Sequence, residues 1–152
     1  VVDLKKLGQR TLWVDCDVLR ADGGTRTASI TGACVAVEMA FQRFVAAGKL
    51  DASPMDRLAA AVSAGIWEGE SRLDLNYHED KDASVDFNYA MTSDFELIEM
   101  QGSGEEATFT EEQMLEMLSY SKQGIATIVE KQNEALRAFD PMAKVDLLAR
   151  FE

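Results

Sequence analysis

The sequence is short of cysteine, proline, histidine and long apolar runs, and each shortage excludes a class of protein. Its 152 residues include two cysteines, two prolines and one histidine. Cys16 and Cys34 lack metal-like spacing and argue for a reduced, cytoplasmic protein rather than a disulfide-stapled secreted one. A single histidine, His78, cannot support a Ser-His-Asp triad argument. No apolar run approaches the roughly 18 residues of a membrane span, whereas 47% apolar content suffices for one domain core.

Positive charge is also scarce, with 15 Lys and Arg against 27 Asp and Glu and a formal net charge of −12. At face value this balance opposes nucleic-acid binding, because phosphate contacts need Lys and Arg. The excess is local, however. Residues 68–116 hold 15 acidic residues and only two basic ones, Arg72 and Lys81, whereas the rest of the chain holds 13 basic and 12 acidic residues. The acidity therefore belongs to one stretch, and the remainder is close to neutral.

Hydrophobic periodicity and turn residues predict an α+β fold with helices packed on one face of a sheet. Residues 1–8 have the pattern of the last turns of a helix, closed by Gly8. A long helix is expected from Thr110, with Gln113 completing a capping box, to about Phe139. The remaining predicted elements are a half-buried strand over 11–19, a helix over 25–47, and strands over 59–67, 73–77, 85–92 and 95–101.

A glycine-rich segment lies between the first predicted strand and the next helix. Gly23 and Gly24 let the backbone approach a ligand closely, and N–H groups at a helix N-terminus attract anions. Thr25 offers a hydroxyl donor, and Arg26 offers a bidentate fork for phosphate. An ordinary strand-to-helix turn with a hydroxyl cap would give the same pattern. Both interpretations stay open from these residues alone.

A second candidate site is acidic and consists of five carboxylates. Asp80 follows one predicted strand and Asp86 opens the next, so a tight loop could bring them together. Two carboxylates with water and phosphate oxygens would suit Mg²⁺, a hard cation that retains several waters. A solvated acidic turn is the alternative interpretation. The five residues are Asp74, Glu79, Asp80, Asp82 and Asp86.

Residues 16–33 closely resemble the signature of the ribonuclease PH family, through the run Cys-Asp-Val-Leu-Arg-Ala-Asp-Gly-Gly-Thr-Arg-Thr-Ala-Ser. The resemblance continues through Asp80, 85–88, 91–92, 99–102 and the last helix. It assigns residues 1–139 to the C-terminal part of a ribonuclease PH domain and 140–152 to a C-terminal extension. Arg20 replaces a usual glutamine. The family's N-terminal portion is not in this sequence, so we expect a fragment that the missing part or another chain completes.

The resemblance implies a ribonuclease PH-like fold (ribosomal protein S5 domain 2-like) with a mixed sheet, and a phosphate-dependent 3′-to-5′ exoribonuclease. Such an enzyme trims the 3′ ends of tRNA precursors and releases nucleoside diphosphates. Carried over by position, Gly24, Thr25 and Arg26 bind the co-substrate phosphate, while Asp80 and Asp86 are the catalytic carboxylates and hold Mg²⁺. The family forms hexamers of three dimers and acts on RNA. A non-catalytic ring subunit of an exosome-like assembly is the alternative function.

Overall fold

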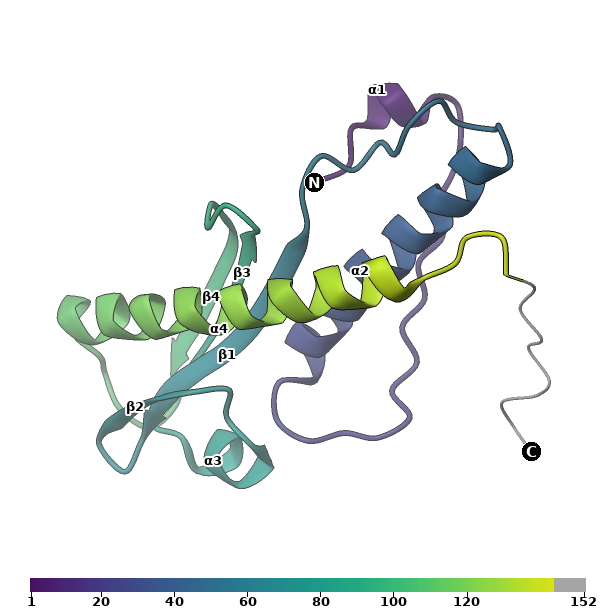
Figure 1. The fold of residues 1–152 in the computed structure, drawn as a ribbon. Helices are drawn as coiled ribbons and strands as arrows, with labels where there is room; N and C mark the ends of the chain where they lie inside the picture. Colours follow the sequence, from purple (N-terminus) through teal and green to yellow (C-terminus); the bar gives the residue numbers. More distant parts are fainter. Residues whose placement is uncertain (144–152) are drawn as a thin grey trace.

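Four strands form one antiparallel sheet in the order β2-β1-β3-β4 in the computed structural model, which describes residues 1–143 (Figure 1). The strands are β1 (Ala59–Trp67), β2 (Glu70–Leu73), β3 (Val85–Thr92) and β4 (Leu97–Gly104). All three pairings among the described residues are antiparallel, so the expected mixed sheet is wrong for this part of the chain. Short turns join β1 to β2 and β3 to β4, and such turns connect antiparallel neighbours, whereas β3 pairs with β1 after the chain has passed through β2 and α3.

The predicted helices at 25–47 and from Thr110 are confirmed as α2 (Thr25–Ala46) and α4 (Glu111–Ala138). Thr110 and Gln113 exchange the two hydrogen bonds of the expected capping box. Figure 1 shows α4 crossing the sheet, and its buried side chains pack against alternate residues of the two inner strands. This core consists of Ala60, Val62, Ala64, Ile66, Val85, Phe87, Tyr89, Met91, Met117 and Ile125.

Helix α4 covers one face of the sheet as expected, whereas α2 lies along the edge of β1. Because β2 is short, part of that edge has no strand beside it, and helix side chains satisfy its backbone. Cys34 Sγ accepts the N–H of Ala59 at 3.1 Å, and Thr31 Oγ1 accepts the N–H of Ala61 at 3.1 Å. Gln132 of α4 donates to the Ala59 carbonyl at 2.9 Å. Side chains of α2 and α4 thus make the hydrogen bonds that a neighbouring strand would otherwise make with this edge of β1.

The predicted strand over 11–19 is wrong, because these residues adopt no helix or strand. An alternating pattern becomes a strand only where another strand pairs with it, and none of the four described strands lies beside this segment. Its side chains stay exposed, including Trp13 at 90% and Leu19 at 94%. The residues before it form α1 (Leu4–Leu7), a single short helix that the Asp3 side chain caps, rather than the end of a longer one.

The predicted strand over 73–77 is also wrong, since β2 ends at Leu73 and α3 (Tyr77–Asp82) follows. Asp74 adopts a left-handed φ of 57°, which turns the chain out of the sheet. Asn76 then caps α3, and Glu79 completes a capping box with it. Local capping chemistry therefore overrides strand propensity here, and it places Asp80 on a helix.

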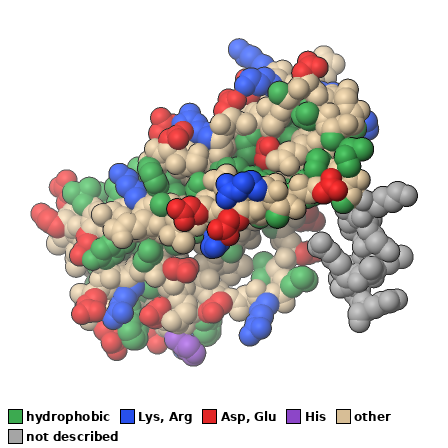
Figure 2. Space-filling view, viewed as in Figure 1, with side chains coloured by type: hydrophobic (Ala, Val, Ile, Leu, Met, Phe, Trp, Pro, Cys, Tyr) green, Lys and Arg blue, Asp and Glu red, His purple; other side chains and the backbone are tan. Residues whose placement is uncertain are grey.

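Helix α4 ends at Ala138, one residue before the domain boundary predicted at 139. Most of the predicted extension, residues 144–152, lies outside the described part of the chain. Within residues 1–143, no helix has both the length and the apolar composition to cross a bilayer. Acidic side chains gather over β2, α3 and the first turns of α4 (Figure 2), as the charge of residues 68–116 predicts.

Candidate active site

The glycine-rich loop packs tightly against the segment that leads into α3. A Cβ atom on Gly23 would lie 2.0 Å from the carbonyl oxygen of Leu75, so only glycine fits there. Asp22 Oδ1 accepts hydrogen bonds from the Gly23 N–H at 2.9 Å and the Tyr77 N–H at 2.6 Å. These bonds, with that from Tyr77 the stronger, lower the pKa of Asp22. These contacts therefore hold the glycine-rich loop against the start of α3.

Helix α2 begins directly after Gly24, which has a left-handed φ of 69° and offers no side chain as a cap. The first N–H groups of α2 therefore lack the usual capping partner and remain available to an anion. The Thr25 hydroxyl donates to the Asp22 carbonyl at 3.2 Å, so in this state it contacts its own loop. The structure thus presents a helix N-terminus at the predicted phosphate site.

Arg26, in the first turn of α2, pairs with Glu99 of β4. Arg26 Nη1 lies 2.7 Å from Glu99 Oε1, and Nη2 donates to Oε2 at 2.9 Å. The hydrogen bonds and the opposite charges raise the pKa of Arg26 and lower that of Glu99. Sequence reasoning did not single out Glu99, because 73 positions separate the two residues and no local pattern links them.

The carboxylate of Asp86, on β3, has one oxygen whose hydrogen-bonding capacity is not satisfied by the described residues. Its Oδ1 atom is buried and has no hydrogen-bond partner among the described residues. Burial raises the pKa of Asp86, and the nearby negative charges of Asp80 and Glu105 raise it further. Asp80 therefore lies close enough to Asp86 for its charge to raise the pKa of Asp86, in agreement with the proximity that the sequence predicts.

The other three acids of the predicted cluster have different surroundings. Glu79 accepts the Asn76 N–H at 3.1 Å in the capping box, whereas Asp74 and Asp82 are exposed. No group of three or more His, Cys, Asp or Glu side chains within residues 1–143 is arranged to hold a metal ion. The unpartnered Oδ1 of Asp86 is by itself the kind of oxygen ligand that a hard divalent cation prefers, with most of the remaining ligands coming from water or substrate.

The register of the sheet places Asp86 and Glu99 on the same face. Asp86 and Ala90 share one face of β3, and Glu99 lies directly opposite Ala90. Phe87 and Tyr89 alternate with them and point into the α4 core. The separation of Asp86 and Ala90 along β3 is about 13 Å at roughly 3.3 Å per residue. The face away from α4 thus carries Asp86 at one end and the Arg26–Glu99 pair at the other.

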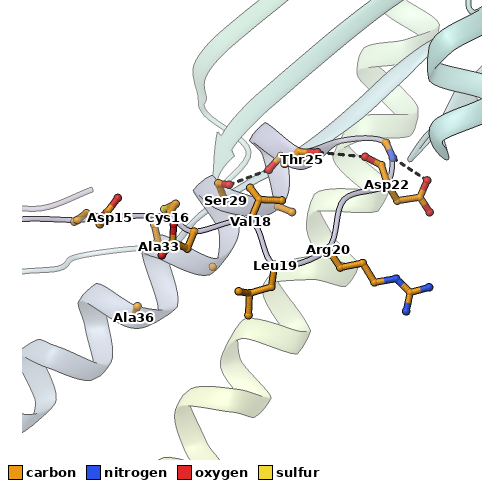
Figure 3. A pocket seen from close by; sticks show the side chains of 15 residues that line it. Asp15, Cys16, Val18, Leu19, Arg20, Asp22, Thr25, Ser29, Ala33 and Ala36 are labelled. Atoms are coloured by element: carbon orange, nitrogen blue, oxygen red, sulfur yellow. Dashed lines mark hydrogen bonds between the residues drawn. The ribbon is translucent and has the colours of Figure 1, made fainter. Parts of the chain in front are cut away.

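A cavity of about 600 Å³ lies between residues 14–20 and the first turns of α2 (Figure 3). Of the candidate site, it borders only Asp22, Gly23 and Thr25, whereas Arg26, Asp80 and Asp86 do not line it. Figure 3 shows Arg20 extending away from α2. The cavity therefore adjoins the glycine-rich loop and is separate from Asp80 and Asp86.

Comparison with known proteins supports the resemblance. Residues 57–124 match the 3′ exoribonuclease family, domain 2. Over 137 residues the chain is 51% identical to a ribonuclease PH of Bacillus velezensis and 53% identical to one of Bacillus mycoides. Each alignment covers 90% of this chain and 56% of the relative, so the chain spans about half the length of these curated relatives.

Among solved structures, rice (Oryza sativa) Rrp46 is similar, with a TM-score of 0.58 and 23% identity over 76% of this chain and 49% of that chain. This likeness concerns the fold alone. Asp80 and Asp86 lie inside the matched residues 57–124, whereas Gly24, Thr25 and Arg26 precede them. Residues 57–124 are thus similar to domain 2 of the 3′ exoribonuclease family, and the chain as a whole is similar to about half of a ribonuclease PH.

Proposed function

We propose that the chain is part of a phosphate-dependent 3′-to-5′ exoribonuclease that trims the 3′ ends of tRNA precursors and releases nucleoside diphosphates. The observation that supports this most directly is the shared sheet face, with an unpartnered Asp86 oxygen at one end and Arg26 at the other. Phosphoryl transfer depends mainly on positioning and on neutralising anions. A carboxylate site on β3 and an anion site at the start of α2, tied to β4 through Glu99, would provide both.

Gly24, Thr25 and Arg26 would hold inorganic phosphate through the α2 N-terminus and the guanidinium. An oxygen of this phosphate attacks the last phosphorus of the RNA, and the bond from that phosphorus to the 3′ oxygen of the preceding nucleotide breaks. The released 3′ oxygen takes up a proton, and the terminal nucleotide leaves as a nucleoside diphosphate. No bond to the protein forms, so the protein's task is to orient two anions in line.

Asp80 and Asp86 would hold Mg²⁺, and the buried Oδ1 of Asp86 is the atom most in need of such a partner. The bound ion would supply positive charge to the phosphoryl oxygens. Asp86 Oδ1 accepts no hydrogen bond from the described residues, so binding a cation there would break no existing contact.

We further propose that RNA contacts lie mainly on the remaining half of the ribonuclease PH, and that a hexamer of three dimers completes the enzyme. The acidic surface of residues 68–116 supports this division, because it would repel an RNA backbone (Figure 2). Cys16 and Cys34 are both free thiols, which is consistent with a reducing cytoplasm.

The assay uses the protein at its natural length and in its natural oligomeric state. A tRNA with extra 3′ nucleotides should yield nucleoside diphosphates only when inorganic phosphate is present. Asp86→Asn should lower turnover by about 100-fold or more, whereas Asp82→Asn, an exposed acid of the same cluster, should leave it unchanged. Release of monophosphates without phosphate would contradict the proposal. RNA binding without turnover would instead favour the non-catalytic ring subunit.

Arg26 provides a separate test of the phosphate site. Arg26→Ala should raise the KM for phosphate, because it removes the charged fork. The matched control is Arg57→Ala, which removes an arginine that pairs with Glu96 on the surface, outside the candidate site. An unchanged KM for phosphate in Arg26→Ala would exclude Arg26 from the binding site.

A further inference from the structure

The ion pair between Arg26 and Glu99 uses only one edge of the guanidinium group. Glu99 approaches the two terminal nitrogens, Nη1 at 2.7 Å and Nη2 at 2.9 Å. A guanidinium carries five N–H donors in a fixed plane, so this end-on contact leaves the edge formed by Nε–H and an outer N–H. No described residue accepts a hydrogen bond from Arg26 Nε. Arg26 can therefore bind Glu99 and a second anion at once.

Glu99 ties Arg26 to the strand that pairs with β3. Arg26 sits on an exposed first turn of α2, and its side chain is 50% exposed. Without a partner, such a long side chain would sample many rotamers. Glu99 is fixed opposite Ala90 by the β3–β4 pairing, on the face that carries Asp86. The carboxylate therefore sets where the guanidinium lies relative to the candidate metal site.

We propose that Glu99 is a positioning residue, which holds Arg26 so that its free edge meets the attacking phosphate. This inference rests on the proposed function, since it assigns a role within the same site. Glu99 itself does not contact phosphate. Its negative charge weakens the attraction for phosphate, and the gain is a fixed orientation of the arginine.

The same hairpin offers a matched control. Arg57 pairs with Glu96, and also with Asp94 at 3.5 Å, beside the turn between β3 and β4. This pair has the same residue types, although Glu96 is 67% exposed and Glu99 42%, and neither Arg57 nor Glu96 lies in the candidate site. Glu96→Ala therefore removes an equivalent surface ion pair without touching Arg26.

The test measures phosphorolysis by the assembled protein with phosphate varied at saturating RNA. Glu99→Ala should raise the KM for phosphate about tenfold, with little change in kcat or in the KM for RNA. Glu99→Gln keeps one acceptor and should raise it less. Glu96→Ala should match the wild type. In an Arg26→Ala background, adding Glu99→Ala should change the KM for phosphate no further, because Glu99 acts only through Arg26.

A KM for phosphate that is unchanged or lower in Glu99→Ala would overturn the inference, and a lower value would show that Glu99 competes with phosphate. A further rise in the Arg26→Ala background would overturn it as well. Calorimetric titration of inorganic phosphate without RNA separates the two proposals. Phosphate binding that weakens in Glu99→Ala, in a protein that releases no nucleoside diphosphate, would support the positioning role and refute the proposed activity.

Discussion

Asp86→Asn should make the protein more stable while making it inactive. The substitution keeps the shape of the side chain and removes a negative charge that is half-buried beside Asp80 and Glu105. An unsatisfied buried polar group costs about 1–3 kcal/mol and more when it is charged, and asparagine keeps the polar group but removes the charge. Because Asp86 is only half-buried, we expect the lower end, an increase of about 1 kcal/mol in the free energy of unfolding.

The sign of the pH dependence follows from the raised pKa of Asp86 in the folded state. The unfolded chain releases this proton near the ordinary value of 3.8, and the folded protein releases it at higher pH. Between those values the folded state binds more protons, so stability falls as pH rises through this window. The advantage of Asp86→Asn should therefore be full above the folded pKa and absent below the ordinary value.

Urea unfolding at fixed protein concentration measures the effect, at about pH 8 and about pH 3. Asp82→Asn serves as the control, since Asp82 is exposed on the same acidic segment and should change stability by under about 0.5 kcal/mol. Equal stability of Asp86→Asn and wild type at the higher pH would refute the reasoning. A gain of the same size at both pH values would refute the titration argument.

Three further substitutions test the packing that positions the site. Gly23→Ala places a Cβ against the Leu75 carbonyl and should lower the unfolding free energy by about 1–3 kcal/mol, and also raise the KM for phosphate because the loop must move. Met117→Ala, at a fully buried core position, should cost about 2–5 kcal/mol in urea unfolding. Thr110→Ala removes half of the α4 capping box and should cost about 1 kcal/mol, with an unchanged urea m-value; no shift in the midpoint would contradict the capping role.

The elements that the sequence predicts well are those whose signals are local. Strands β1 and β3 are confirmed at the predicted bounds, because continuous or alternating apolar residues end at clear turn residues. Helix α4 is confirmed from Thr110 because its capping box is encoded within four residues. Each of these signals is contained in a short stretch of sequence and does not depend on contact with a distant segment.

Apart from residues 73–77, where local capping chemistry decides, the errors arise where a distant partner determines the structure. Residues 11–19 alternate like a strand, yet pairing needs a neighbour, and the described structure supplies none. The Arg26–Glu99 pair shows the same principle in the site, because proximity comes from the sheet register rather than from a motif. Asp80 lies near enough to Asp86 to raise its pKa, but it belongs to helix α3 and not to the loop that the sequence predicts after residue 77.

Two backbone amides at the edge of β1 report on the docking of α2, because side chains of α2 accept their hydrogen bonds. The amide protons of Ala59 and Ala61 are held by Cys34 and Thr31 of α2 rather than by a strand. Their hydrogen-exchange rates therefore respond to the undocking of α2 from the sheet as well as to the unfolding of β1. Since α2 begins at the glycine-rich loop that we propose binds phosphate, slower exchange at these two amides on adding inorganic phosphate would report binding at a distance from the proposed site.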